Sequence, residues 1–340
     1  RRDADRIKSY LKDGGKAVII GGGLLGLELA GSLASLGIEV TIIQRSSRLM
    51  RGQLDDMGSD ILNDEIINRN IEIIYNDEVA SFEGDTHLKA IELKSGKKLD
   101  CDALFFAAGI KPNIEIGQEA GLKCDRGIIV NDQLLSSDPK IFAMGEIAQH
   151  RNKTYGTTPS AQDQARIVAA YLNGDRWATY KGSLSFNILK LKDLQLASLG
   201  QVRKPEGPEY DEITLIDRRK NYYKKCILRN DVLIGAILIG DKSEFNHFKD
   251  LIEQEIELAD QRLPLLKGSA EQSESPIGKV VCSCNNVGEG NIENLINEGC
   301  CNFQELCTKS GAGTGCGSCR PEVKKILMKN IAHKAEEVQS

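Results

Sequence analysis

Two close pairs of cysteines are the residues of this chain best suited to bind a metal. Cys282 and Cys284 form a C-x-C pair, and Cys316 and Cys319 form a C-x-x-C pair, both within stretches rich in Gly, Ser and Asn. Because thiolates hold both iron–sulfur clusters and structural zinc, four that converge predict a metal centre. The spacing of the cysteines does not separate zinc from iron, so both remain open on this ground.

The sequence around the second pair favours a bulky, negatively charged centre. Glycines at alternate positions let the backbone bend and bring amide donors to the sulfurs: Gly311, Gly313, Gly315 and Gly317. No strand is expected ahead of these glycines, which excludes a phosphate-binding loop. Pro321 suits the first turn of a helix with an apolar face, and the positive end of that helix would point at an anionic cluster.

Three glycines predict a dinucleotide site nearer the N-terminus. Gly21, Gly23 and Gly26 form G-x-G-x-x-G between an apolar strand expected at residues 17–20 and an amphipathic helix expected at residues 24–36. In that context the first glycine allows a tight turn, the second lets the pyrophosphate approach, and the third lets helix and strand pack closely. The alternative is a glycine-rich turn in an unrelated α/β protein, which the order strand, helix, strand disfavours.

The end of the second strand bears on which nucleotide binds. An acidic residue there would accept the ribose 2′-hydroxyl of NAD, but this chain has Gln44, followed by Arg45 and Arg48. Without a carboxylate to repel it, a 2′-phosphate is allowed, and two guanidinium groups are suited to bind one. The alternative is that both arginines are solvated loop charges, so NADH and NADPH both remain open.

The remaining cysteines have simpler interpretations. We expect those between the two pairs to be packing residues and the isolated ones to be small buried residues: Cys300, Cys301 and Cys307, and Cys101, Cys124 and Cys226. A nicotinamide site upstream favours iron over zinc at the paired cysteines, because redox-inert zinc gives the electrons nowhere to go.

Length, charge and hydropathy exclude several classes of protein. The chain has 340 residues and a net charge of −5, with lysines and arginines scattered among acidic residues, which excludes a nucleic-acid-binding surface. Apolar runs such as residues 232–239 fall far short of the ~20 residues that a membrane span needs, and no secretory signal precedes the first domain. We therefore expect a cytoplasmic protein. Because the chain opens at Arg1 within an expected helix, we also expect its natural N-terminus to be missing.

The expected elements follow the order of an α/β protein. After the first strand and helix, strands are expected at residues 38–43, 71–75, 79–82, 88–93 and 103–107. A short strand at residues 141–144 and a helix at residues 160–172 come next. A small, mostly β domain then contains strands at residues 186–191, 213–216, 222–228 and 232–239 and a helix near residues 244–258.

These motifs together resemble the flavoprotein part of assimilatory NAD(P)H nitrite reductase large subunits and the related electron-transfer subunits of nitrate reductase. The stretches from Ile19 to Glu28 and from Arg48 to Asp55 resemble that family's nicotinamide domain, which is inserted into an FAD domain in pyridine-nucleotide disulfide-oxidoreductase folds. The resemblance implies that Glu28 lies near the nicotinamide ring. Gln44 departs from the family, in which that position is usually acidic.

The same resemblance implies FAD as a second cofactor. Residues 105–113, with Gly109, resemble the strand that returns to the FAD domain, and residues 141–146 resemble its second flavin motif. Gly145 and Glu146 are then the expected flavin-binding residues of that motif, with Glu146 near the ribityl or phosphate region. The helix at residues 160–172 would point its N-terminus at the flavin ring. The first FAD segment of the family is not in this chain, so we expect FAD to be held weakly or not at all.

The C-terminal part has two further resemblances. Residues 186–200 and 222–241 resemble the C-terminal domain of rubredoxin-reductase-like flavoproteins, and the last module is similar to bacterioferritin-associated ferredoxin, which implies a 2Fe-2S cluster on the four paired cysteines. The expected fold is therefore α/β, a Rossmann-like NAD(P) domain inserted in a partial FAD domain, then a small α+β C-terminal domain and a small helical 2Fe-2S domain. The expected boundaries are 1–15 for a leading helix and linker, 16–106 for the NAD(P)-binding domain, 107–178 for the C-terminal segment of the FAD-binding domain, 179–267 for the reductase C-terminal domain, 268–276 for a linker and 277–335 for the 2Fe-2S domain.

The resemblance implies electron transfer from NAD(P)H through FAD and the 2Fe-2S cluster to an acceptor that reduces nitrite or nitrate. The expected partner is a siroheme nitrite reductase or molybdenum nitrate reductase domain or subunit, and a homodimer is also open. No catalytic acid or base is needed. Two alternatives remain: an NAD(P)H:rubredoxin or ferredoxin reductase with a soluble carrier, and a cysteine module that serves for docking or iron sensing without electron transfer.

Overall fold

The structure is a computed structural model that describes residues 2–11, 14–259, 262–267, 276–283, 285–315 and 317–337. The chain divides into two compact units, each made of two stretches of sequence. The first comprises residues 1–109 and 185–271, and the second comprises residues 110–184 and 272–340. No helix among the described residues is both long enough and apolar enough to cross a bilayer.

A four-stranded parallel sheet forms one half of the first unit. Its order is β3-β2-β1-β7, with every neighbouring pair parallel. The strands and the helices that accompany them are β1 (Lys16–Ile20), α2 (Leu24–Ala34), β2 (Glu39–Gln44), α3 (Asp56–Ile67), β3 (Ile71–Tyr75) and β7 (Ala103–Phe106), after a leading helix α1 (Arg2–Tyr10). Buried β-branched residues such as Val18, Ile19 and Ile42 fill the strands, as expected of a parallel sheet covered on both faces. This arrangement confirms the Rossmann-like domain.

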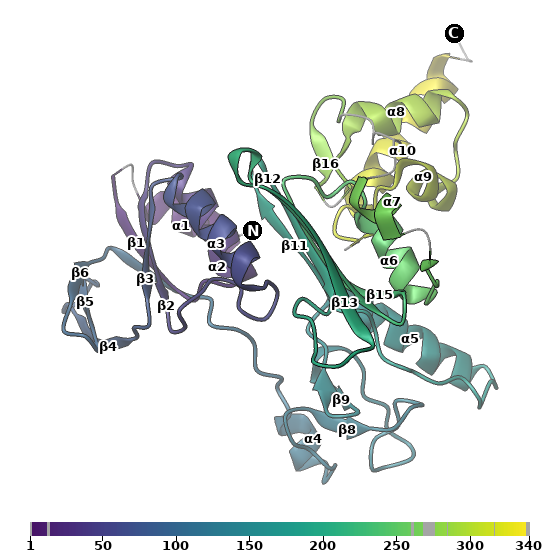
Figure 1. Ribbon diagram of the computed structural model, residues 1–340, viewed down its shortest axis with the longest axis horizontal. Helices are drawn as coiled ribbons and strands as arrows, with labels where there is room; N and C mark the ends of the chain where they lie inside the picture. Colours follow the sequence, from purple (N-terminus) through teal and green to yellow (C-terminus); the bar gives the residue numbers. More distant parts are fainter. Residues whose placement is uncertain are drawn as a thin grey trace. The chain divides into compact units, whose positions relative to one another are not determined.

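A small antiparallel meander covers one face of the parallel sheet. It consists of β4 (Val79–Glu83), β5 (Ala90–Leu93) and β6 (Lys98–Asp100). Ile91 and Leu93 of β5 pack with Val18 and Ile43 of the parallel sheet in one buried cluster. In Figure 1 the meander lies on the side of the sheet opposite to α2 and α3.

A five-stranded antiparallel sheet, in the order β11-β12-β15-β14-β13, forms the other half of the first unit. Its elements are β11 (Phe186–Leu191), β12 (Leu194–Gly200), β13 (Tyr210–Asp217), the 3-10 turn η2 (Arg218–Lys220), β14 (Tyr222–Arg229), β15 (Val232–Ile239), α6 (Phe245–Glu253) and α7 (Arg262–Lys267). The sequence predicted four of these strands and the helix α6, but it did not predict β12. This sheet and α6 confirm the small α+β domain.

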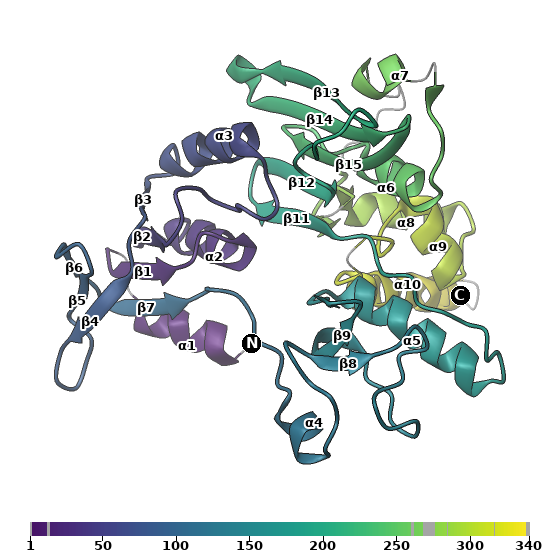
Figure 2. The same ribbon diagram turned by 60° about the horizontal axis from the view of Figure 1, so that its bottom comes forward.

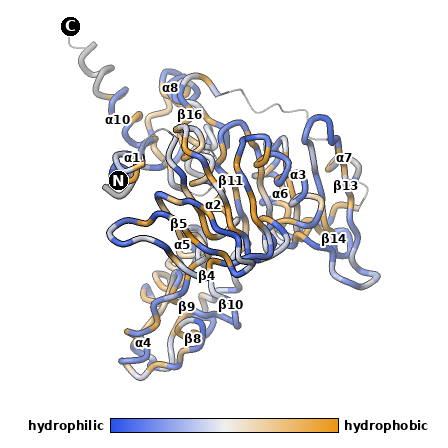
Figure 3. The backbone as a smooth tube through the Cα atoms, turned by 90° about the vertical axis from the view of Figure 1, so that its left-hand side faces the viewer, coloured by the Kyte–Doolittle hydropathy of each residue, from blue (hydrophilic) through white to orange (hydrophobic). Residues whose placement is uncertain are grey.

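The two halves of the first unit share one hydrophobic core. Leu27 and Ala30 of α2 belong to the same buried cluster as Leu189 and Leu191 of β11. At Gly31 the helix approaches the strand so closely that a Cβ atom would overlap the Leu191 side chain. Figure 2 shows α2 between the parallel sheet and β11, and Figure 3 shows hydrophobic colour along α2 and the neighbouring strands.

A buried ion pair fixes α6 and α7 to the five-stranded sheet. Lys224 of β14, whose side chain is 2% exposed, pairs with Glu244 at the start of α6. The same ammonium group donates a hydrogen bond of 3.0 Å to the Leu265 carbonyl oxygen in α7. A charge removed from water in this way needs both partners, because an unpaired buried ion is far more costly than a paired one.

The second unit begins with short elements around residues 110–184. They are α4 (Glu115–Glu119), β8 (Ile128–Val130), the 3-10 turn η1 (Gly145–Ile147), β9 (Ala148–His150), β10 (Lys153–Thr154) and α5 (Thr158–Leu172). The helix predicted at residues 160–172 is confirmed as α5. The strand predicted at residues 141–144 is wrong: Phe142 forms only an isolated bridge with Leu135, while Ile141 and Met144 are exposed.

The C-terminal module contains a hairpin and three helices. Its elements are β16 (Val280–Cys282), β17 (Val287–Gly288), α8 (Glu289–Asn297), α9 (Phe303–Ser310) and α10 (Arg320–Glu337). Val323, Ile326 and Leu327 of α10 are buried, which confirms the predicted apolar face, although Ile331 is 38% exposed. The predicted linker at residues 268–276 lies, apart from its last residue, outside the described residues.

The buried pair generates a prediction about stability. Glu244→Gln removes the carboxylate that compensates the Lys224 ammonium group, so we expect the free energy of unfolding to fall by about 3 kcal/mol. Chemical denaturation followed by circular dichroism measures this change. Glu253→Gln is the matched control on the same helix, because the Glu253 side chain is 45% exposed and pairs with Lys249 at 3.6 Å. We expect the control to change stability by less than about 0.5 kcal/mol; similar losses in both variants would contradict the role of the buried pair.

Candidate nicotinamide, flavin and iron–sulfur sites

The glycine turn between β1 and α2 is formed by direct contact of backbone with backbone. Gly21 has φ = +111°, and a Cβ atom there would lie 2.5 Å from the Ala107 carbonyl oxygen. A Cβ atom at Gly26 would overlap the Gly21 carbonyl oxygen. These two positions therefore exclude a side chain, because the turn, the start of α2 and the end of β7 touch one another there.

Gly23 differs from the other two glycines because it faces open space. A Cβ atom there would meet no heavy atom within 4 Å. Gly23 is also the N-cap of α2, with extended backbone and no side-chain hydrogen bond to the amides of the first turn. Those amides and the positive end of the helix dipole are suited to a pyrophosphate, and no protein atom fills the space beside Gly23.

Gln44 braces the loop that follows β2. Its Oε1 accepts a hydrogen bond of 2.8 Å from the Gly22 amide, and its Nε2 donates to Ser46 Oγ at 2.6 Å and to the Arg48 carbonyl at 3.1 Å. The Met50 amide adds a 3.0 Å bond to the Gly22 carbonyl. The uncharged Gln44 side chain therefore joins the glycine turn to the loop after β2, which is expected to bind the adenosine ribose. NAD-specific domains carry a carboxylate at the position of Gln44.

The two predicted arginines have different surroundings. Arg45 is 86% exposed, and its Nε lies 3.9 Å from a Glu78 carboxylate oxygen, which resembles the solvated charge of the simpler interpretation. Arg48 is only 35% exposed and forms an ion pair with Asp56 at the start of α3. Both arginines lie in the loop that follows Gln44, and of the two only Arg48 forms a close ion pair.

Glu28 of α2 contacts the C-terminal domain. Its Oε1 accepts a hydrogen bond of 3.0 Å from the backbone amide of Lys190 in β11. The position near the nicotinamide ring, which the family resemblance implies for Glu28, stays a prediction. The contact does tie the middle of α2 to the five-stranded sheet.

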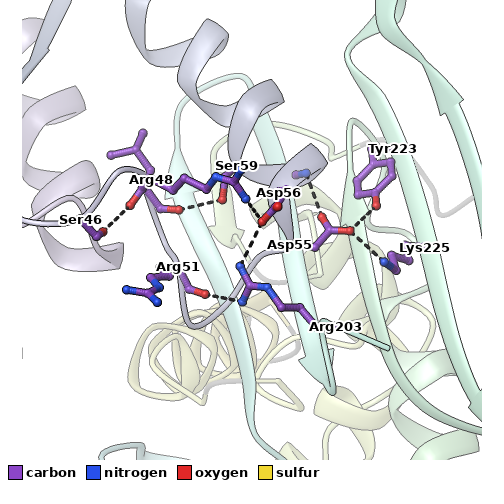
Figure 4. Close-up of polar contacts among 11 residues, drawn as sticks. Ser46, Arg48, Arg51, Asp55, Asp56, Ser59, Arg203, Tyr223 and Lys225 are labelled. Atoms are coloured by element: carbon purple, nitrogen blue, oxygen red, sulfur yellow. Dashed lines mark hydrogen bonds and ion pairs between the residues drawn. The ribbon is translucent and has the colours of Figure 1, made fainter. Parts of the chain in front are cut away.

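A polar network that the sequence did not predict surrounds Asp55. This buried residue caps α3 through the Gly58 amide at 2.9 Å and accepts hydrogen bonds from Tyr223 Oη at 2.7 Å and Lys225 Nζ at 3.0 Å (Figure 4). Burial, and then the hydrogen bond to Asp55, raise the pKa of Tyr223, which keeps that hydroxyl a proton donor. An aspartate directly before a helix is a cap signal that the sequence contains, but its partners are about 170 residues away.

The predicted flavin residues lie in two separate turns. Gly109 has φ = +104° and open space around its Cβ position. Gly145 has φ = +80°, and its amide donates a hydrogen bond of 2.5 Å to Gln164 Oε1 in α5, which places η1 against that helix. Glu146 is exposed. Thr157, the N-cap of α5, makes no side-chain bond to the helix amides, so the first turn of α5 can accept an anionic partner.

The described part of the cysteine module brings its two cysteine-bearing loops together. Cys282 ends β16 and Cys319 precedes α10, and both are buried. Cys284 and Cys316 lie outside the described residues. Asn285, next to Cys284, donates hydrogen bonds from Nδ2 to the Gly311 carbonyl and, at 2.9 Å, to Thr314 Oγ1. This contact joins the loop after Cys282 to the glycine segment before Cys316, as ligands to one centre require.

Cys307 lies beside the predicted ligands. Its sulfur would be 3.4 Å from a Cβ atom at Gly313, and burial raises the pKa of its thiol, an effect that Arg320 opposes and Cys282 reinforces.

Cys300 and Cys307 are buried, as predicted for packing residues, but Cys301 is exposed, so that prediction is wrong for Cys301. Cys101 and Cys226 are buried as expected, whereas Cys124 is only half-buried. Among the described residues, which leave out two of the predicted ligands, no group of three or more Cys, His, Asp or Glu is placed to hold a metal. The buried Cys282 and Cys319, one from each pair, and the contact of Asn285 with the glycine segment suit thiolate ligation of a cluster.

The glycine turn generates a prediction about nucleotide binding. Gly23→Ala should leave the melting temperature nearly unchanged, since its methyl group meets no atom of the protein. It should weaken NAD(P)H binding at least about tenfold, or about 1.4 kcal/mol, because the methyl group occupies the path of the pyrophosphate. Isothermal titration and thermal melting measure the two effects. Gly26→Ala is the contrasting variant, which should lower the melting temperature because its methyl group overlaps backbone. Unchanged nucleotide affinity in Gly23→Ala would contradict this account of the site.

The Asn285 contact generates a second prediction. Asn285→Ala should make the cluster easier to lose, because the two cysteine-bearing loops are then no longer joined by its amide. We expect iron content after a fixed challenge with a chelator to fall at least about twofold relative to the unaltered chain. Asn294→Ala, on the exposed side of α8, is the control and should retain iron normally. Equal iron loss in all three proteins would exclude a role for Asn285.

Comparison with known families covers most of the chain in three consecutive segments. Residues 2–165 match the pyridine nucleotide-disulphide oxidoreductase family. Residues 186–256 match the rubredoxin NAD+ reductase C-terminal domain, and residues 280–329 match the BFD-like 2Fe-2S binding domain. These matches assign NAD(P)H, FAD and a 2Fe-2S cluster as cofactors.

Individual relatives extend the match along the whole chain. The assimilatory nitrate reductase electron transfer subunit of Bacillus subtilis is 34% identical over 92% of this chain and 41% of its own length. The nitrite reductase (NAD(P)H) of the same species is 32% identical over 97% of this chain and 42% of its length. The nitrite reductase (NADH) large subunit of Escherichia coli is 32% identical over 99% of this chain and 41% of its length. The chain thus spans about two fifths of these relatives.

Solved structures of reductases share the fold. Putidaredoxin reductase, in its covalent complex with putidaredoxin, has a TM-score of 0.68 and 25% identity over 78% of this chain and 66% of its own. A ferredoxin reductase from Rhodopseudomonas palustris has a TM-score of 0.64 and 26% identity over 75% of this chain and 65% of its own. The chain therefore has the pyridine nucleotide-disulphide oxidoreductase fold and is, over nearly its whole length, a homologue of NAD(P)H-dependent nitrite reductases and of the nitrate reductase electron transfer subunit.

Proposed function

We propose that this chain transfers electrons from NAD(P)H, through FAD and a 2Fe-2S cluster, to a centre that reduces nitrite or nitrate. The observation that carries the proposal is the presence, on one chain, of a nicotinamide-type glycine turn and a BFD-like domain with four paired cysteines. Bound FAD supplies the exchange between two-electron and one-electron chemistry that such a chain requires. A cluster on the same chain then provides the one-electron exit.

The residues of the chain act by binding and orienting. The amides at the start of α2 hold the pyrophosphate, and the exclusion of side chains at Gly21 and Gly26 keeps that helix end close to the sheet. The first turn of α5 offers its amides to a negative charge beside Gly145. No side chain has to donate or remove a proton, so the rate depends on how the chain positions its cofactors.

NADPH is the nucleotide that the proposed site accepts alongside NADH. Support comes from the uncharged Gln44 at the end of β2 and from Arg45 and Arg48 beside it. A carboxylate at that position would repel a 2′-phosphate, whereas guanidinium groups bind one through charge-assisted hydrogen bonds.

The proposed partner is a siroheme nitrite reductase or molybdenum nitrate reductase domain or subunit. The names of the curated relatives, which are nitrite reductases and a nitrate reductase subunit, support this choice. A cytoplasmic location is part of the same proposal, since thiolate ligands persist in a reducing compartment. The proposal leaves a homodimer open. A second candidate function, NAD(P)H:rubredoxin or ferredoxin reductase, draws its support from the match of residues 186–256 to the rubredoxin NAD+ reductase C-terminal domain.

Removal of one cluster ligand tests the proposal. Cys316→Ser should abolish most of the 2Fe-2S absorption of the anaerobically purified chain. With NAD(P)H and added FAD, it should also lower the reduction of a one-electron acceptor such as cytochrome c by at least about tenfold. Cys301→Ser is the control, because Cys301 is exposed and belongs to neither pair.

Each outcome of this experiment has a meaning. Loss of the cluster with full acceptor reduction would favour docking or iron sensing over electron transfer. A chain that is colourless and loaded with zinc, even when prepared without oxygen, would overturn the proposal. If acceptor reduction requires the cluster but the chain reduces rubredoxin and supports no nitrite or nitrate reduction with either partner, the second candidate function holds instead.

A further inference from the structure

The loop between β2 and α3, which the proposed site assigns to the adenosine end of the nucleotide, is held by hydrogen bonds from both halves of the first unit. From its own half, Gln44 holds this loop to the glycine turn, and Ser59 Oγ donates a hydrogen bond of 2.9 Å to the Leu49 carbonyl. From the C-terminal domain, Arg203 Nη1 donates a hydrogen bond of 2.7 Å to the Arg51 carbonyl (Figure 4). Arg203 follows β12, the strand that sequence patterns did not predict.

Arg203 also shares a carboxylate with Arg48. Its Nη2 lies 3.5 Å from Asp56 Oδ1, and the same oxygen forms the ion pair with Arg48. Figure 4 shows the Asp56 carboxylate between the two guanidinium groups, one from each half of the unit. The ion pairs from Arg48 through Asp56 to Arg203 therefore connect the proposed 2′-phosphate site to the C-terminal domain.

The exposure of these side chains lets their pairing change. The Asp56 side chain is 64% exposed and that of Arg203 is 46% exposed, so neither contact is buried. Exposed ion pairs are weak, whereas guanidinium–phosphate contacts are strong and frequently bidentate. Arg48 can therefore exchange its carboxylate partner for a phosphate group at little cost.

The exchange leaves Asp56 as a negative charge next to a phosphate dianion. Arg203 is then the neighbouring cation that compensates the carboxylate, and its bond to the Arg51 carbonyl keeps it there. Without Arg203, Asp56 would both retain Arg48 more strongly and repel the phosphate. A nucleotide without the 2′-phosphate would experience neither effect.

We propose that Arg203 and Asp56 are specificity-determining residues, through which the C-terminal domain sets the preference for 2′-phosphorylated over unphosphorylated nicotinamide nucleotides. Arg203 is a positioning residue that acts through Asp56 and Arg48 and does not touch the nucleotide. The inference rests on the proposed NAD(P)H function and adds to it a role for the domain outside the dinucleotide fold.

Two nucleotide fragments separate the 2′-phosphate from the rest of the ligand. 2′,5′-ADP carries the 2′-phosphate and is otherwise identical to 5′-AMP, and titration calorimetry at low and high salt measures the affinity of the full chain for each. Arg203→Gln should weaken the binding of 2′,5′-ADP about fivefold and leave the affinity for 5′-AMP within about twofold. Arg203→Lys retains the charge and should recover part of the loss. Arg219→Gln, an exposed arginine of the same domain in η2, is the matched control and should change neither affinity.

Substitution of the Asp56 carboxylate should change the affinity for 2′,5′-ADP in the opposite direction. Asp56→Asn removes the competitor for Arg48 and should strengthen 2′,5′-ADP about threefold. In the double variant, Arg203→Gln should then have almost no effect, because Arg203 has no carboxylate left to compensate. Raising the salt concentration should reduce all of these differences, since they arise between exposed charges.

The possible results are distinct. If Arg203→Gln weakens both fragments equally, or neither, the inference is wrong even though the nucleotide site exists. Additive effects in the double variant would also overturn it. If the unaltered chain binds neither fragment, nor NADH nor NADPH, the proposed nicotinamide function itself fails. Melting curves of every variant check that the fold is intact, and Arg203→Lys keeps the test valid if Arg203→Gln unfolds.

Discussion

The contact of backbone with backbone at the glycine turn is the constraint on which the nucleotide site depends. Gly21 and Gly26 have no space for a side chain, because the end of β1, the start of α2 and the residue after β7 meet there. This contact fixes the position of the α2 amides relative to the sheet. Gly23 remains open within the same turn, so one short segment combines a rigid support with an accessible anion site.

The loop after β2 shows how a second domain contributes to that site. Gln44 connects the loop to the glycine turn, and Asp55, Asp56 and Arg203 connect it to the five-stranded sheet. Tyr223 and Lys225 project from β14 and meet the cap of α3. A nucleotide-binding loop that is fixed from two sides loses little conformational freedom on binding, which favours affinity.

Sequence patterns predicted the parts of this fold that depend on local order. The β1–turn–α2 segment follows from three glycines that lie between an apolar strand pattern and an amphipathic helix pattern. The strands β11 and β15 have the predicted bounds. β12 was missed because it is buried on both faces and includes Gln, Ala and Ser, so it shows neither alternation nor β-branched residues. The strand predicted at residues 141–144 lacks a neighbouring strand to pair with. Local sequence does not reveal which partner a strand will find.

In the candidate site, as in the fold, the sequence predicted the features that depend on local spacing and missed the contacts between distant residues. Glycine and cysteine positions follow from spacing, because the chemistry requires those residue types at those intervals. The ion pair of Asp56 with Arg203 joins residues about 150 positions apart, and the side chains themselves are ordinary surface charges. Only the folded chain brings them together, and no spacing rule applies to them.

The shared core of α2 and β11 also limits how this protein can be divided. Because Gly31 admits the Leu191 side chain against the helix backbone, and Leu27, Ala30 and Leu189 lie in the same cluster, neither half has a finished apolar surface of its own. A fragment that ended after β7 would expose the apolar side of α2 to water. A shortened chain that is meant to fold therefore has to keep the parallel sheet with its helices and the five-stranded sheet together.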